Sequence, residues 1–235
     1  MDYSKPITVD FPLKGEWTAP HTPGDKVPSH GTDALGQRFA YDFFRTEMNL
    51  KRKFKFYKTT NLKYNIIGIS INDCYCYKEN IYSPVNGTVI VVKDGVKEPK
   101  HLHPVIDLVK VLIRSFSVSV KALFVPVSKI NLHKYIGNYV IIEFDELYAF
   151  FAHISTGTIC VQTGQILKKG DRIGLVGHTG NSTAPHLHFH LMDSSDLLTA
   201  RGVPCAFTKY DILTEEGWKL IENDIPKSDQ RIRLI

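Results

Sequence analysis

The sequence predicts a mainly β protein built on an antiparallel sheet, with one helical insertion. Short runs rich in β-branched and aromatic residues recur between Gly, Pro and Asn, which is typical of sheet proteins. The clearest runs are 81–92, 138–144, 147–153 and 185–192. With 235 residues, of which 43% are hydrophobic, the chain is long enough to bury a core, so we expect one domain over 1–235.

The first of these runs contains a turn signal. Asn86-Gly87 is the dipeptide that tight hairpins favour, and it precedes the apolar run Val89–Val92. Pro84 limits the strand before it, because proline cannot donate to a sheet ladder. This pattern predicts a hairpin around Asn86-Gly87.

A first insertion is expected at about 45–80. It interleaves basic residues with aromatic ones, namely Lys51, Arg52, Lys53, Lys55 and Lys58 with Phe54, Phe56 and Tyr57. Such a pattern can grip single-stranded nucleic acid by charge and stacking. Charge runs more often face water, so we favour a solvated segment with inward aromatics and expect no nucleic-acid partner.

A second insertion is expected at about 93–136. Its sequence predicts a helix over 104–116, because Pro104 suits a first helical turn. One face of this helix would be apolar, formed by Val105, Ile106, Leu108, Val109 and Leu112. We expect this helix to cover an edge or rim of the sheet. From Asp196 onward we expect a short helix, irregular chain and a final basic strand over 231–235.

Charge and cysteine content set broad limits on the class of protein. The formal charge is +5, from 29 Lys and Arg against 24 Asp and Glu. This mild excess favours anionic surroundings such as cell-wall polymers, nucleic acid or lipid headgroups. Cys74, Cys76, Cys160 and Cys205 form no zinc-ribbon pattern, and Cys74 and Cys76, two apart on an expected strand, are expected to be free thiols.

No apolar leader is seen at the start, and no stretch is long enough to span a bilayer. We therefore expect a cytoplasmic protein as encoded. It would reach a cell wall or the exterior by unconventional export or by lysis.

The segment 183–191 carries the strongest chemical signal. Strand alternation places His186, His188 and His190 on one face and the apolar residues between them on the other. Imidazole is both a common metal ligand and the usual general base near neutral pH. A single His-x-His pair is weak by itself, and we expect no function for the equally spaced His101 and His103.

The wider segment Gly164–Phe189, with Gly177-His178-Thr179-Gly180-Asn181 and Pro185-His186-Leu187-His188, resembles the terminal signature of the lysostaphin and LytM type zinc endopeptidases. Further pieces follow the family's order at 82–89, 137–142 and 148–154. The resemblance covers about 29–192. It implies a barrel-sandwich core of the duplicated hybrid motif type.

The resemblance also implies one Zn²⁺ per chain and its ligands. The family's usual His-x-x-x-Asp fails here, because Ala34 follows His30 by four. We match His30, Asp42 and His188 to the ligands, in a variant branch with a longer first-motif spacing. Asp33 is the competitor of Asp42, although Asp33 suits a polar turn.

His153 and His186 would then stand beside the metal as catalytic residues, and which of them is the base stays open. We expect solvent-facing imidazoles at His178 and His190. His21 is expected in a proline-rigid loop, with the substrate groove as the alternative.

The implied activity is a zinc metalloendopeptidase that hydrolyses peptide bonds in peptidoglycan cross-bridges or stem peptides, or in another peptide. One alternative is an inactive peptidase-like module that binds or regulates at the cell wall. A less favoured one is a sugar-phosphotransferase-type phosphocarrier, which would need no Asp ligand.

Overall fold

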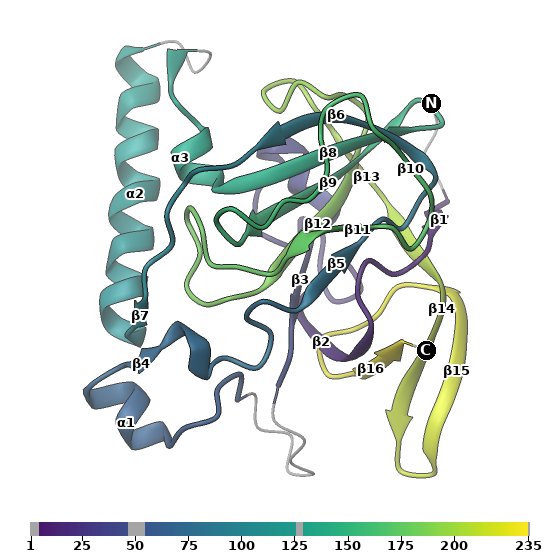
Figure 1. Ribbon diagram of the computed structural model, residues 1–235, viewed down its shortest axis with the longest axis horizontal. Helices are drawn as coiled ribbons and strands as arrows, with labels where there is room; N and C mark the ends of the chain where they lie inside the picture. The colour runs from purple at the N-terminus through teal and green to yellow at the C-terminus, as the bar shows by residue number, and fades with distance from the viewer. Residues whose placement is uncertain (1–4, 47–54, 126–128, 235) are drawn as a thin grey trace.

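The computed structural model describes residues 5–46, 55–125 and 129–234, and it is mainly β (Figure 1). Its elements are β1 (Ile7–Val9), β2 (Gly15–His21), η1 (Ala34–Phe39), β3 (Tyr41–Phe44), α1 (Asn61–Ile66), β4 (Ile69–Ser70), η2 (Ile71–Asp73), β5 (Asn80–Tyr82), β6 (Gly87–Lys93), β7 (His101–Leu102), α2 (Pro104–Phe124), α3 (His133–Ile136), β8 (Asn138–Phe144), β9 (Leu147–Ile154), β10 (Ile166–Leu167), β11 (Arg172–Leu175), β12 (Leu187–Met192), β13 (Gly202–Val203), β14 (Cys205–Thr214), β15 (Gly217–Asp224) and β16 (Arg231–Leu234).

One large sheet holds most of these strands, in the order β1-β14-β16-β2-β3-β12-β9-β8-β6-β10, while β5 pairs with β11 and β4 with β7 in two separate small sheets. β13 pairs with β12, and β15 pairs with β14. The pairing of β1 with β14 is parallel, whereas the pairs around the centre, β3–β12, β12–β9 and β9–β8, are antiparallel. The predicted mainly β fold is therefore confirmed, with a mixed sheet.

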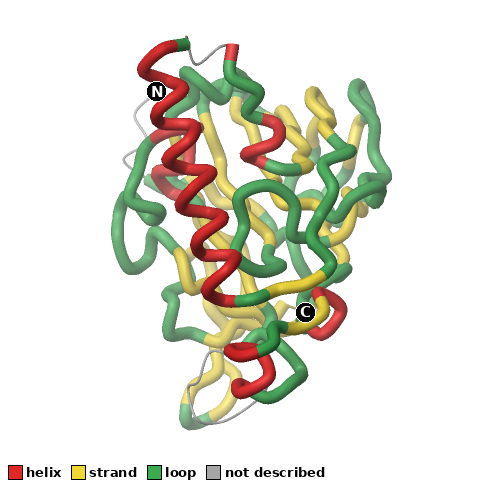
Figure 2. The backbone as a smooth tube through the Cα atoms, turned by 90° about the vertical axis from the view of Figure 1, so that its left-hand side faces the viewer, coloured by secondary structure: helices red, strands yellow, loops and turns green. Residues whose placement is uncertain are grey.

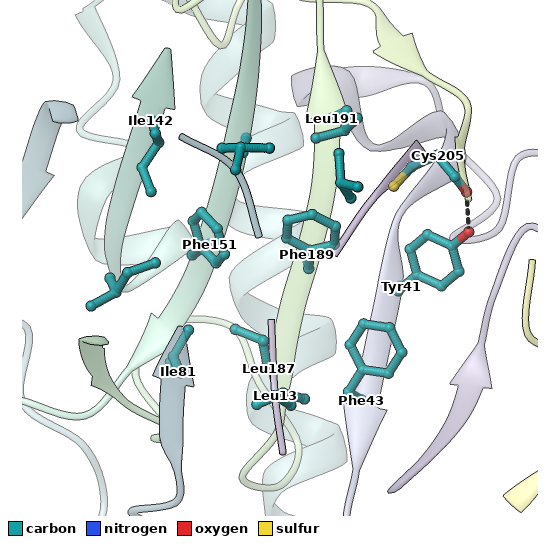
Figure 3. Close-up of a cluster of buried hydrophobic side chains, with 14 of the residues drawn as sticks. Leu13, Tyr41, Phe43, Ile81, Ile142, Phe151, Leu187, Phe189, Leu191 and Cys205 are labelled. Atoms are coloured by element: carbon teal, nitrogen blue, oxygen red, sulfur yellow. Dashed lines mark hydrogen bonds between the residues drawn. The ribbon is translucent and has the colours of Figure 1, made fainter. Parts of the chain in front are cut away.

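The core lies on one face of the central strands (Figure 3). Alternation along β12 sends Leu187, Phe189 and Leu191 into this core, where each is 0% exposed. The ring centroids of Phe189 and Phe151 lie 5.2 Å apart across the β12–β9 pair. Burying one such side chain contributes roughly 1.5–3 kcal/mol, so this face holds β12 rigidly. Its histidines point to the opposite face.

The predicted hairpin at Asn86-Gly87 is wrong. β5, which precedes the turn, pairs with β11, whereas β6, which follows it, pairs with β8 and β10. Gly87 is needed for another reason: a Cβ there would lie 2.4 Å from the backbone oxygen of Glu143. The dipeptide therefore marks the point where the backbone of β6 lies close to its paired strand β8, and it does not form a hairpin turn.

The predicted helix is confirmed and extends to Phe124 as α2. His103 caps it: the His103 amide donates to Asp107 Oδ2 at 2.7 Å, and Pro104 occupies the first turn. His103 therefore has a structural role, and His101 Nε2 donates to the Ile67 carbonyl at 3.0 Å. No helix in the described part of the chain is long and apolar enough to cross a membrane.

The expected short helix after Asp196 is wrong. The described chain there forms a turn at 197–199 and then the antiparallel pair β14–β15, followed by the expected strand as β16. Gly217, at φ +113°, opens β15. β14 is stabilised by pairing with β16 and with β1. Because β1 lies far away in the chain, the local sequence does not predict this pairing.

In the first insertion, Phe56 and Tyr57 are 9% and 6% exposed, in agreement with inward aromatics. Lys51, Arg52, Lys53 and Phe54 lie outside the described residues. Cys74 and Cys76 are free, as expected, but both lie in turns and bridges rather than on a strand.

Candidate metal centre

Asp42 is the hub of a cluster of imidazoles. It lies on β3 and is 6% exposed. Oδ2 of Asp42 lies 3.0 Å from Nε2 of His30, and Oδ1 lies 2.9 Å from Nδ1 of His188. Nε2 of His186 is 3.4 Å from Oδ1, and Nδ1 of His21 is 2.9 Å from Oδ2. Four imidazoles therefore face one buried carboxylate.

Strand pairing brings most of these groups together. Asp42 is the register partner of His188 on β12 and also of His21 on β2. A bulge between Thr18 and His21 alters the β2 register next to the site. Neighbouring strands lie about 5 Å apart, so side chains on one face meet directly.

His30 comes from the loop before η1 and is oriented by Ser29. The Ser29 hydroxyl donates to the Ala40 carbonyl at 2.7 Å, so it accepts from Nδ1 of His30 at 3.0 Å. In a neutral imidazole this leaves the lone pair of Nε2 facing Oδ2 of Asp42. Two acceptors at this distance need a positive charge between them, either a proton or a metal cation.

His186 shows the same arrangement. Its Nδ1 donates to the Ala184 carbonyl at 2.8 Å, which leaves Nε2 directed at Asp42. Nitrogen and carboxylate oxygen atoms that converge on one buried point are the donor set that zinc prefers. The residues present therefore fit a zinc ion.

Electrostatics keep the carboxylate ionised. Burial alone would raise the pKa of Asp42, but the imidazoles of His186, His188 and His21 around the carboxylate hold this pKa well below its ordinary value. Burial lowers the pKa of His188, although its hydrogen bond to Asp42 opposes this. A neutral imidazole next to an ionised carboxylate is the protonation state that metal ligands require.

His153 lies beside this cluster at the end of β9. Its φ of +63° is unusual for a residue other than glycine. Nδ1 donates to the Thr179 carbonyl at 2.8 Å, and the ring centroid lies 4.7 Å from that of His186. Burial, together with the neighbouring imidazoles of His186 and His188, holds the pKa of His153 well below its ordinary value, so its Nε2 is a free base.

All five predicted site residues line one cavity of about 370 Å³: His30, Asp42, His153, His186 and His188. Val111 of α2 and Tyr135 and Ile136 of α3 form part of its wall. The segment predicted as the second insertion therefore contributes directly to the cavity. Asp33, the competing ligand, is excluded from it, since its carboxylate pairs with Arg38 at 2.8 Å.

His21 is the residue that sequence reasoning missed. It was expected in a loop, but it is the last residue of β2 and hydrogen-bonds Asp42. This bond raises the pKa of His21, against an opposing effect of burial. His21, His30 and Asp42 offer ligand atoms that all lie within 4.8 Å of one another. That group holds two of the three predicted ligands, with His21 in place of His188.

The expectation of solvent-facing imidazoles at His178 and His190 is wrong. They are 2% and 1% exposed. Nδ1 of His178 donates to the Ser182 hydroxyl at 2.9 Å, and burial lowers the pKa of His178 to about 4. His190 stacks on Phe150 at 4.8 Å.

Comparisons with known proteins find a family profile that matches part of the chain. The profile described as "Peptidase family M23" matches residues 119–199. The matched range includes His153, His186 and His188 but lies after His30 and Asp42. The resemblance to lysostaphin and LytM type peptidases is thereby confirmed.

Two curated relatives from Vibrio cholerae are similar over a short segment. The chain is 40% identical to "Peptidoglycan DD-endopeptidase ShyB" over 63 residues, which is 27% of this chain and 15% of that protein. It is 46% identical to "Peptidoglycan DD-endopeptidase ShyA" over 61 residues, 26% of this chain and 14% of that protein. The match thus spans about one seventh of these relatives' length.

Among solved structures, the catalytic domain of lysostaphin from Staphylococcus simulans is similar at 20% identity and a TM-score of 0.32, covering 62% of this chain and 88% of that one. A zinc-containing peptidase from Vibrio cholerae is similar at 22% identity and a TM-score of 0.32, covering 63% of this chain and 35% of that one.

Proposed function

We propose that this protein is a zinc-dependent metalloendopeptidase that hydrolyses peptide bonds in peptidoglycan. The observation that carries the proposal is the buried carboxylate of Asp42, faced by imidazole nitrogens of His30, His186 and His188 at 2.9–3.4 Å. Such a cluster is costly to bury unless a cation compensates it.

We assign His30, Asp42 and His188 as the zinc ligands. His30 presents a lone pair from Nε2. Oδ2 of Asp42 faces the imidazole of His30, and Oδ1 faces that of His188. Two neutral imidazoles and one carboxylate leave coordination positions for water and substrate. A zinc ion held there would polarise the scissile carbonyl and make water acidic near neutral pH.

His186 and His153 supply the proton chemistry in this proposal. Nδ1 of His186 donates to the Ala184 carbonyl, and Nδ1 of His153 donates to the Thr179 carbonyl. In each ring Nε2 is therefore left to accept a proton as a base. One would remove the proton of the attacking water, and the other would stabilise the oxyanion or return the proton to the leaving amine. His186 is nearer to Asp42, which favours it as the base.

Peptidoglycan is the substrate class that best suits the remaining observations. The two relatives described above are named as peptidoglycan endopeptidases. A net charge of +5 favours an anionic wall. The cavity holds polar side chains, including Asn181 and Thr183, that could bind the amides of a peptide.

A missing ligand would favour the inactive-module alternative. All three proposed ligands are present, and His30 and His188 both face the carboxylate of Asp42. The phosphocarrier alternative needs an exposed, phosphate-accepting imidazole. His186 and His188 are 5% and 7% exposed, and an ionised carboxylate beside them would repel phosphate.

A digest tests the proposal. Zinc-loaded protein should release peptide fragments with new amino termini from purified peptidoglycan, and a chelator should stop the release. Zinc binding without cleavage of peptidoglycan or of a peptide library would instead favour the binding module.

A further inference from the structure

Helix α2 turns its apolar side outward. Leu112, Ile113 and Phe116 are 59%, 62% and 72% exposed. The other members of this face are Val105, Ile106, Leu108, Val109, Leu123 and Phe124, each between 46% and 82% exposed. At 3.6 residues per turn these side chains share about 160° of the helix circumference. We call this set the α2 apolar face.

Polar contacts on the opposite side fix this orientation. Asp107 is 4% exposed and accepts from the Lys110 amine at 2.9 Å. The Arg114 guanidinium donates to the Gly180 carbonyl at 2.6 Å, and the Asn181 side chain donates to Ser115 at 3.1 Å. The helix is therefore attached to the loop of the candidate site through its polar side. In Figure 2, α2 runs in front of the rest of the chain, with its outer side open.

Cations lie beside the C-terminal half of α2. Lys121 is exposed, whereas Asp107, the acidic residue of α2, is buried and paired with Lys110. A groove beside α2 is lined by Arg114 and Lys121 together with Lys129 and Lys134, and no acidic residue is among its described lining. Such a groove suits phosphate groups.

We propose that α2 docks on the surface of an anionic lipid bilayer. The α2 apolar face would enter the boundary between headgroups and acyl chains, and the cations of the groove beside α2 would meet lipid phosphates. Since no described helix is apolar enough to span, α2 would lie in the plane of the surface. A second copy of the chain is a poorer occupant, because it offers no acidic residue on this face to pair with the cations.

Docking would hold the candidate site next to the membrane. Val111 of the same helix lines the site cavity, and Arg114 holds Gly180 in the neighbouring loop. The proposal does not depend on zinc or on peptidase activity, so its failure and that of the proposed function can be told apart.

Vesicle co-sedimentation of the whole protein tests the proposal. Vesicles of phosphatidylcholine alone are compared with vesicles that contain about one third phosphatidylglycerol, at about 0.1 M salt. The wild type should bind the anionic vesicles, and Leu112→Gln/Phe116→Gln should weaken binding by roughly tenfold or more. The matched control, Ile166→Gln/Leu220→Gln, changes side chains that are 79% and 53% exposed on β10 and β15 and should bind as the wild type does.

Three results would overturn the proposal. The first is no binding of the wild type to anionic vesicles, and the second is equal loss in the control variant. The third is a dimer, measured by light scattering, that Leu112→Gln/Phe116→Gln dissociates, because it would assign the face to a second copy. Thermal unfolding should be unchanged in both variants, which shows that lost binding is not lost folding.

Discussion

Nδ1 of His188 lies 2.9 Å from Oδ1 of Asp42, although 146 residues separate the two in the chain. The contact follows directly from the sheet, because Asp42 and His188 are register partners on β3 and β12. Their geometry is therefore fixed by backbone pairing and by the core beneath β12. A site built this way needs little rearrangement to bind an ion.

Replacing Asp42 by alanine should abolish zinc binding, because the carboxylate supplies the charge that both proposed histidine ligands share. Asp33→Ala is the matched control: Asp33 is the competing carboxylate, but it pairs with Arg38 away from the cavity. Zinc content after dialysis is measured by elemental mass spectrometry. It should fall to background in Asp42→Ala and stay at one zinc per chain in Asp33→Ala. The reverse pattern would make Asp33 the ligand.

His186→Gln and His153→Gln should retain zinc and lose turnover by roughly 10²–10⁴-fold, the usual contribution of general acid–base catalysis. Glutamine keeps a polar side chain of similar length but cannot accept and return a proton. Steady-state cleavage and zinc content are measured on the same preparations. Zinc loss in His186→Gln would mean that its Nε2, 3.4 Å from Asp42, is a ligand instead.

His21→Ala should weaken zinc binding by roughly tenfold without abolishing it, since partners that orient a ligand typically contribute this much. In the structure Nδ1 of His21 donates to Oδ2 of Asp42 at 2.9 Å, and the His21 side chain is about half exposed. Competition with a chelating dye gives the zinc affinity. Complete loss of zinc would promote His21 to a ligand in place of His188, and an unchanged affinity would make it a surface residue.

His178 predicts a pH dependence of stability. Burial lowers the pKa of His178 from 6.5 to about 4, so the unfolded chain binds this proton first as pH falls. The stabilisation that neutral His178 provides is complete above pH 6.5 and is lost as pH falls from 6.5 towards 4. The free energy of unfolding should therefore fall by roughly 2 kcal/mol between pH 7 and pH 5 because of this group. Urea unfolding of zinc-free protein should show a smaller drop over this interval in His178→Gln. An equal drop in both proteins would contradict this.

The strand character of the site could be predicted because it is local. Alternation alone separates His186 and His188 from Leu187 and Phe189, and the structure confirms both faces of β12. The convergence of His30 and Asp42 with this strand came from the family resemblance and not from any local pattern.

The remaining features depend on contacts that local sequence does not encode. His21 joins the cluster only because β2 pairs with β3, and the burial of His178 and His190 involves residues far away in the chain, such as Glu98 and Phe150. The Asn86-Gly87 signal was misread because Gly87 serves a close approach to Glu143. In α2 the periodicity gave the helix correctly, but not the direction of its apolar face, which is set by polar contacts of Asp107 and Arg114.

The most direct test of the central claim is the zinc content of the untagged protein beside that of His188→Ala. His101→Gln is the matched control, because His101 belongs to a His-x-His pair of the same spacing but lies outside the cavity, where its Nε2 donates to the Ile67 carbonyl. We expect one zinc per chain in the wild type and in His101→Gln, and none in His188→Ala. A wild type that takes up no zinc on reconstitution, or a His188→Ala variant that keeps it, would contradict the proposed metal centre.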